Sequence, residues 1–262
     1  MMNVQIKSLA EPMARSDGFR ALITRGQPPQ KQAADQWIGE LANVSPASLT
    51  AYERALREDP AKRHCMRRLL QEREKQSVTL LYAPETRDQT LLVQRFLQTV
   101  RTPAILVLYA SEMGHTQAMA QKMAEGVQLA GIKPQVKDAF GATATEINDY
   151  DALLLGSGTT GDGELLDEAQ DIYDDLDRVD LNGMPCGVFG AGDTSYELYC
   201  EAVNVIHKKL AELGAEPIIA DFKVDFSMSD EEEKQALQLG KQFAEAVWDR
   251  AIRQVILPDN ES

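Results

Sequence analysis

The strongest constraint in the sequence is an alternation of apolar runs with amphipathic helical patterns between residues 104 and 248. The stretches "ALLLGSG" and "CGVFGAG" are continuously apolar and end in glycines, as strands buried on both faces do. Apolar strands that alternate with helices are typical of a parallel sheet with helices on both sides. This part of the chain is therefore predicted to be a doubly wound α/β domain. The expected strands cover 104–109, 135–139, 152–158, 186–192 and 217–224, and the expected helices cover 116–130, 197–213 and 230–248.

The first hundred residues carry a second, smaller α/β pattern. Pro46 and Pro60 mark helix starts, because proline is tolerated in the first turn of a helix. With a linker at 98–103, the chain is expected to divide into an accessory α/β domain over 1–100, the larger α/β domain over 103–250 and a tail over 251–262. The expected strands cover 4–9, 19–24 and 77–83, and the expected helices cover 35–42, 47–59, 61–74 and 86–100.

The net charge changes sign between these two parts. Residues 1–100 contain 15 Lys and Arg against 11 Asp and Glu, a net charge of +4, whereas residues 101–262 contain 12 against 30, a net charge of −18. The acidic part should repel nucleic acid and anionic membranes and attract basic protein surfaces, although an acidic surface also serves solubility alone. The acidic run "DEAQDIYDDLDRVD" is interpreted as a solvated helix face or a docking surface for a basic partner.

Targeting signals and cysteine usage together predict a cytoplasmic location. No apolar run approaches the roughly 20 residues of a membrane span, and the N-terminus lacks the basic-then-apolar order of a signal peptide. The three cysteines (Cys65, Cys186 and Cys200) are odd in number and have no CxxC spacing. This argues against a disulfide framework or a zinc site and for a reducing compartment. The sequence sets no oligomeric state.

Polar, glycine-rich loops follow three of the expected strands, at the sheet edge where α/β proteins bind ligands. The first loop, "SEMGHT", has hydroxyls at Ser111 and Thr116 that can donate to phosphate oxygens, and Gly114 lets backbone approach closely. The N-terminus of the following helix also attracts an anion. An ordinary N-capped turn is the alternative, and His115 is interpreted as a solvent-facing loop residue.

The second loop, "GSGTTGDGELLDE" over 156–168, holds more glycines and hydroxyls than a turn requires. The third loop, "GAGDTSYELYC" over 190–200, presents Tyr196 just before a helix. A tyrosine beside polar neighbours suits a stacking platform, with core packing as the alternative.

Together, [ST]-x-x-G-x-T in the first loop, "GDG-E" in the second and "G-GD-SYE-YC" in the third resemble the flavodoxins over residues 103–250. The resemblance implies a flavodoxin-like, doubly wound sheet of five parallel strands that binds FMN, with its phosphate at the first loop and Tyr196 stacked on the flavin. The residues themselves predict no catalytic residue and no metal, because the sequence has no Ser-His-Asp set and its three histidines (His64, His115 and His207) are scattered. The implied FMN-binding residues are Ser111, Glu112, Met113, Gly114, His115, Thr116, Ser157, Gly158, Thr159, Thr160, Gly161, Asp162, Gly190, Ala191, Gly192, Asp193, Tyr196 and Cys200.

The resemblance further implies an electron carrier that cycles its flavin through quinone, semiquinone and hydroquinone states. The Gly161 carbonyl would stabilise the semiquinone, and surrounding carboxylates would disfavour added negative charge. The partners would be a reductase and an acceptor with basic docking surfaces. Many flavodoxins place a tryptophan where this chain has Thr160, which leaves two alternatives: either flavin affinity is weaker, or Leu165 or a residue of the first domain covers that flavin face. The chain resembles the short-chain type.

Residues 3–98 resemble an uncharacterised bacterial family, the domain of unknown function 488. The resemblance rests on "DGFRALITRG", "SLTAYERALREDP" and "VTLLYAPETRDQTLLVQRFL", but "GQPPQ" replaces the family's WPRG segment. It implies a fold without a function. Arg20, Arg25 and Tyr82 are candidates for a remnant site, with structural roles as the alternative.

Two other functions stay open. One is a flavin-dependent reductase of a quinone or similar small acceptor, which would oxidise NAD(P)H without a partner. The other is a non-redox interaction module that has kept the fold and lost FMN.

Overall fold

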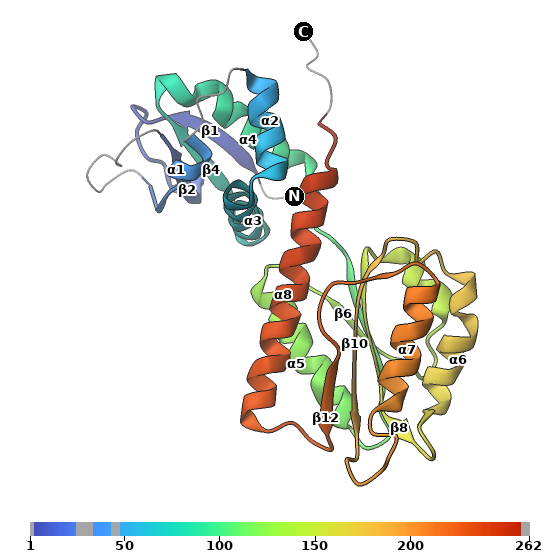
Figure 1. Cartoon of the computed structure of the whole chain (residues 1–262). Helices are drawn as coiled ribbons and strands as arrows, with labels where there is room; N and C mark the ends of the chain where they lie inside the picture. The colour runs from blue at the N-terminus through green and yellow to red at the C-terminus, as the bar shows by residue number, and fades with distance from the viewer. Residues whose placement is uncertain (1–2, 25–33, 43–47, 258–262) are drawn as a thin grey trace. The chain divides into compact units, whose positions relative to one another are not determined.

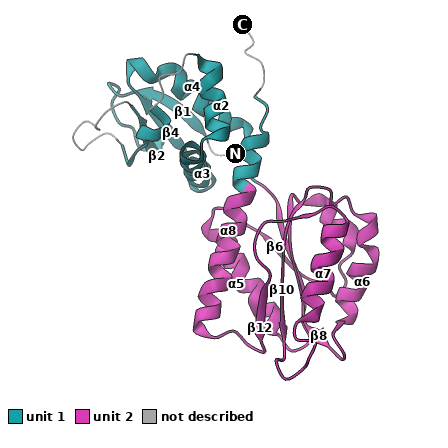
Figure 2. Ribbon diagram, viewed as in Figure 1, with its two compact units in different colours: residues 1–102, 248–262 teal, residues 103–247 magenta. Residues whose placement is uncertain are grey.

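The computed structural model describes residues 3–24, 34–42 and 48–257. It divides into two compact units (Figure 2). Unit 1 comprises Met1–Thr102 together with Trp248–Ser262, and unit 2 comprises Pro103–Val247. Within the described ranges, no helix has the length and apolar character that crossing a membrane demands.

Unit 2 is built on a parallel sheet whose strands follow the order β11-β10-β7-β5-β6, with β12 pairing along the same side of β10 as β11. Every residue of β5 and β7 is buried, which explains why their sequences are continuously apolar. The predicted five-stranded parallel sheet is thus confirmed. The strands are β5 (Ile105–Ala110), β6 (Gln135–Asp138), β7 (Ala152–Ser157), β10 (Pro185–Gly192), β11 (Glu216–Pro217) and β12 (Phe222–Asp225).

Helices cover both faces of this sheet, α5 and α8 on one side and α6 and α7 on the other (Figure 1). Helices α5 and α8 pack closely at two glycines. A Cβ on Gly126 would lie 2.0 Å from the Leu237 carbonyl oxygen, and a Cβ on Gly240 would lie 2.0 Å from the Met123 carbonyl oxygen. This close approach fixes the helix whose N-terminus follows the first loop. The helices are α5 (His115–Leu129), α6 (Asp167–Asp175), α7 (Glu201–Glu212) and α8 (Asp230–Gln254).

Three elements after residue 196 differ by several residues from the sequence-based prediction. The strand expected over 217–224 is split into β11 and β12, because the chain between them leaves the ladder with β10. The helix expected over 197–213 begins at Glu201, because Cys200 has a left-handed backbone (φ 50°) that interrupts helical geometry. Helix α8 continues past residue 250 to Gln254.

Unit 1 has its own parallel sheet, in the order β1-β4-β2-β3. Pro60 is the first residue of α3, where the Asp59 carboxylate accepts hydrogen bonds from the Ala61 and Lys62 N–H groups. The helix expected over 35–42 is wrong in its first half, which forms a strand paired with β2; Pro46 lies outside the described residues. The elements are β1 (Val4–Ser8), β2 (Phe19–Ile23), β3 (Gln36–Trp37), α1 (Gly39–Ala42), α2 (Leu49–Glu58), α3 (Pro60–Lys75), β4 (Val78–Tyr82) and α4 (Arg87–Thr99).

The end of α8 belongs to unit 1. Trp248 and Ile252 are completely buried. Between them, the Asp249 carboxylate pairs with Arg63 at 3.4 Å and Arg67 at 2.7 Å, both on α3. Unit 1 is therefore assembled from two segments that are far apart in the sequence.

Candidate functional site

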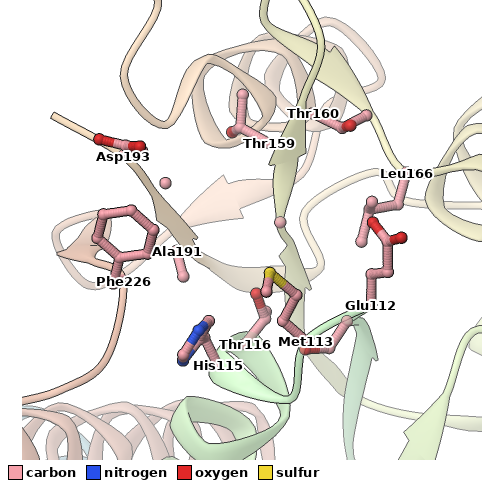
Figure 3. Close-up of a pocket in the computed structure, with 13 residues that line it drawn as sticks. Glu112, Met113, His115, Thr116, Thr159, Thr160, Leu166, Ala191, Asp193 and Phe226 are labelled. Atoms are coloured by element: carbon pink, nitrogen blue, oxygen red, sulfur yellow. The ribbon is translucent and has the colours of Figure 1, made fainter. Parts of the chain in front are cut away.

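A cleft of about 200 Å³ lies at the carboxyl ends of β5, β7 and β10 (Figure 3). This is the edge where α/β sheets place ligands. All three glycine-rich loops contribute to it, as does one residue after β12. The lining residues are Ser111, Glu112, Met113, His115, Thr116, Gly158, Thr159, Thr160, Leu166, Ala191, Gly192, Asp193 and Phe226.

The first loop leaves the N-terminus of α5 without a side-chain cap. Gly114 is the N-cap residue, with a left-handed backbone (φ 85°), and as a glycine it provides no side-chain cap for the first turn. A Cβ on Gly114 would meet nothing within 4 Å, so the glycine is required for its backbone angle and not for space. An ordinary capped turn would occupy these N–H groups. Here they remain available to an anion, with the buried Thr116 hydroxyl beside them.

The second loop is tied to the first at its start and then folds into a short hairpin. The Gly158 N–H donates to the Ala110 carbonyl oxygen at 3.2 Å. Strands β8 (Thr159–Thr160) and β9 (Glu164–Leu165) pair antiparallel across a turn in which Gly161 and Gly163 have positive φ angles of 49° and 91°. The Thr159 hydroxyl accepts the Ala202 N–H at 3.3 Å, which anchors the hairpin to α7.

The third loop is held by a carboxylate from β12. Asp225 accepts the Thr194 N–H at 3.0 Å and the Thr194 hydroxyl at 2.7 Å. At the base of the loop, a Cβ on Gly190 would lie 2.2 Å from the Ser157 carbonyl oxygen. Gly190 is therefore a packing requirement between β10 and β7.

The structure brings most of the predicted residues to the cleft and places the others around it. Tyr196 is 64% exposed on the third loop. Cys200 is fully buried in the core, where its thiol donates to the Gly190 and Val224 carbonyl oxygens, and burial raises its pKa. The predicted residues that do not line the cleft are Gly114, Ser157, Gly161, Asp162, Gly190, Tyr196 and Cys200.

Two apolar residues that sequence reasoning missed line the cleft. Leu165 and Leu166 both belong to the buried core, at 7% and 8% exposed, but Leu166 lines the cleft and the expected Leu165 does not. Phe226 follows β12, outside the three loops. Figure 3 shows Phe226 and Asp193 on one side of the cleft, and Leu166 and Glu112 on the other. The available signal for Phe226 was a bulky apolar residue two positions after the strand predicted over 217–224.

A second, acidic hollow of about 370 Å³ adjoins the cleft and shares Ser111, Glu112, Thr160 and Leu166 with it. Its carboxylates make this side of the cleft electronegative, which disfavours the approach of anions from that direction. Among the described residues, no group of three or more His, Cys, Asp or Glu is placed to hold a metal ion. The remaining residues of the hollow are Asp138, Phe140, Asp167 and Glu168.

A family model described as Flavodoxin matches residues 107–240, which contain all the residues that line the cleft. The chain belongs to the flavodoxin family. The flavodoxin domain is 36% identical over 141 residues to probable flavodoxin 2 of Bacillus subtilis, covering 53% of this chain and 93% of the relative. The crystal structure of oxidised flavodoxin 2 from Bacillus cereus matches with a TM-score of 0.53 and 38% identity, covering 55% of this chain and 99% of that one.

Flavodoxin-like sequence also occurs within a larger relative. The flavoprotein alpha-component of an NADPH sulfite reductase from Buchnera aphidicola is 30% identical over 131 residues, which cover 49% of this chain and 22% of that protein. Residues 3–98 of this chain lie outside the matched range. Their resemblance to the domain of unknown function 488 stays a prediction. Of its candidate residues, Arg20 pairs with Asp35, Tyr82 ends β4, and Arg25 lies outside the described residues.

Proposed function

We propose that the cleft binds FMN and that the chain is an electron carrier of the short-chain flavodoxin type. The observation that carries the proposal is the uncapped N-terminus of α5, which meets hydroxyls from the first loop at one end of a cleft whose sides are apolar. An anionic group and a planar apolar group on one ligand fit this pattern, as they do in a flavin mononucleotide.

The phosphate would be held by neutral groups. None of the described residues that line the cleft is Lys or Arg. Ser111 and Thr116 would donate from their hydroxyls, and the first N–H groups of α5 would add the positive end of the helix dipole. His115, the first residue of α5, stands beside them.

The flavin would lie between apolar side chains from different loops. Leu166 and Phe226 line opposite sides of the cleft (Figure 3), and Met113 lines it from the first loop. Tyr196 would stack from the third loop. Thr160 takes the position where many flavodoxins have tryptophan, so Leu166 would be the main apolar cover on that side. When bound, FMN supplies one-electron and two-electron redox chemistry.

The carboxylates around the cleft would adjust that chemistry and select partners. Glu112 and Asp193 line the cleft, and their negative charge would disfavour adding charge to a reduced flavin. The same charge, within a segment of net charge −18, would steer redox proteins with basic docking surfaces toward the flavin edge.

Anaerobic reduction of the FMN-loaded protein tests this function. We expect stepwise reduction by dithionite, passage of electrons to a basic acceptor such as cytochrome c, and no oxidation of NADH or NADPH when they are added alone. Direct NAD(P)H oxidation would favour the reductase instead. A protein that stays colourless in excess FMN would favour the interaction module.

A further inference from the structure

Phe226 differs from the other residues that line the cleft because it comes from outside the three loops. It is the first residue after β12, and its side chain is 49% exposed. Its ring meets that of His115 edge-on, with centroids 6.4 Å apart and planes at 79°. The two rings thus contact each other at the edge of the cleft, between the first loop and the third.

The Phe226 backbone is in the left-handed region, with φ 55°. Among the described residues other than glycine, Cys200 alone shares a positive φ. A bulky side chain makes this conformation costly, and such strain persists where the surroundings enforce it. Glycine would meet the backbone requirement at no steric cost, so the ring of Phe226 is the feature that needs an explanation.

Hydrogen bonds hold the strained residue against the third loop. The Phe226 N–H donates to the Gly192 carbonyl oxygen at 2.8 Å. The preceding residue, Asp225, accepts from both the N–H and the hydroxyl of Thr194. These bonds fix the backbone of Phe226 beside the cleft, and 49% of its side chain faces solvent.

We propose that Phe226 is the aromatic wall of the FMN site, which covers the bound nucleotide beside His115 and excludes water from that side of the cleft. This inference rests on the proposed function. Leu166 lines the cleft from the opposite side (Figure 3) but is only 8% exposed, so the apolar surface that a planar heteroaromatic nucleotide would bury comes mainly from Phe226, which is 49% exposed. Phe226 lines the cleft and Tyr196 does not, so the Phe226 ring would add an aromatic contact to the stacking proposed for Tyr196.

Two substitutions distinguish the effect of the Phe226 ring on FMN binding from the effect of its backbone strain on stability. Phe226→Ala and Phe226→Gly both remove the ring, and each should raise the Kd for FMN about tenfold, measured by quenching of flavin fluorescence. Phe226→Gly also removes the strain, so in the absence of FMN it should melt about 2–4 °C above Phe226→Ala. Phe226→Tyr should keep the Kd within about twofold of that of the unchanged protein.

Leu129→Ala is the matched control, because Leu129 is an exposed apolar residue at the far end of α5. It should leave the Kd unchanged. If the unchanged protein binds FMN and Phe226→Gly binds it equally well, the proposal that the Phe226 ring covers FMN is refuted, while the proposed function stands. Equal melting temperatures for the alanine and glycine variants would refute the strain argument. If the unchanged protein fails to bind FMN, both proposals fail.

Discussion

Gly158 donates its backbone N–H to the carbonyl oxygen of Ala110 at 3.2 Å, which joins the end of β7 to the end of β5. The first and second loops diverge from this point, one toward the uncapped end of α5 and the other toward the β8–β9 hairpin. The cleft opens where they separate. Its position is therefore set by backbone pairing between central strands.

The phosphate site is tested by Thr116→Val, which removes a hydroxyl and keeps the side-chain shape. Thr116 is buried, so valine fits the same space. A hydrogen bond to a charged group contributes about 1.5–3 kcal/mol, and we expect the Kd for FMN to rise by a factor of about 10–100. Riboflavin, which lacks the phosphate, should bind as before. Equal weakening of both flavins in a titration would contradict this assignment.

The packing role of Gly190 is tested by Gly190→Ala. Its Cβ would lie 2.2 Å from the Ser157 carbonyl oxygen, so β10 must shift, at a cost of about 2–3 kcal/mol in the free energy of unfolding. Gly141→Ala is the control, because its Cβ meets nothing within 4 Å and its φ of 77° adds strain alone, about 1 kcal/mol. Urea unfolding followed by circular dichroism measures both. If the two substitutions lowered the free energy of unfolding equally, close packing against Ser157 would not be the reason for glycine at position 190.

The C-terminal part of α8 should contribute directly to the stability of unit 1. Trp248 is fully buried, and Trp248→Ala should lower the free energy of unfolding of unit 1 by about 3–5 kcal/mol. Trp248→Phe, which keeps most of the volume, should cost less. FMN binding by unit 2 should survive in both variants. Thermal unfolding monitored by circular dichroism measures the change, and an unaltered profile for Trp248→Ala would contradict the two-segment account of unit 1.

Acid should weaken unit 1 through Asp17. The Lys7 ammonium donates to this carboxylate and holds its pKa below the usual 3.8, with a further hydrogen bond from the Ala14 N–H. Because the folded pKa lies below the unfolded one, the stabilisation is complete above about pH 4 and is lost as the pH falls through the folded pKa. Asp17→Asn should be less stable at pH 7 and lose stability less steeply below pH 4. Parallel acid unfolding curves would contradict this.

The sequence predicted the parts of the fold that depend on local pattern. Strands β5 and β7 are buried on both faces, so their positions follow from continuous apolar runs. The break between β11 and β12 was not predictable, because residues of one apolar stretch pair with β10 at two separate places. Helix α8 continues beyond its predicted end at Trp248 to Gln254, and its last turn includes Ile252, which is buried in the non-contiguous unit 1.

In the cleft too, residues with a local sequence signal were predicted, and a residue placed by pairing of distant strands was missed. Ser111, Thr116, Gly158 and Gly192 were recognisable because their types and spacing carry a local signal. Phe226 was missed because its place in the cleft depends on pairing of β12 with β10, far away in the sequence. Cys200 was assigned to the cleft from the motif, but the turn at its left-handed backbone directs it into the core.

The most direct test of the account is a titration of the purified protein with FMN and, separately, with riboflavin, followed by flavin fluorescence. We expect saturable quenching with FMN at one site per chain and a Kd for riboflavin at least about tenfold higher, since riboflavin has no phosphate to bind at the N-terminus of α5. Absence of FMN binding, or equal affinity for the two flavins, would contradict it.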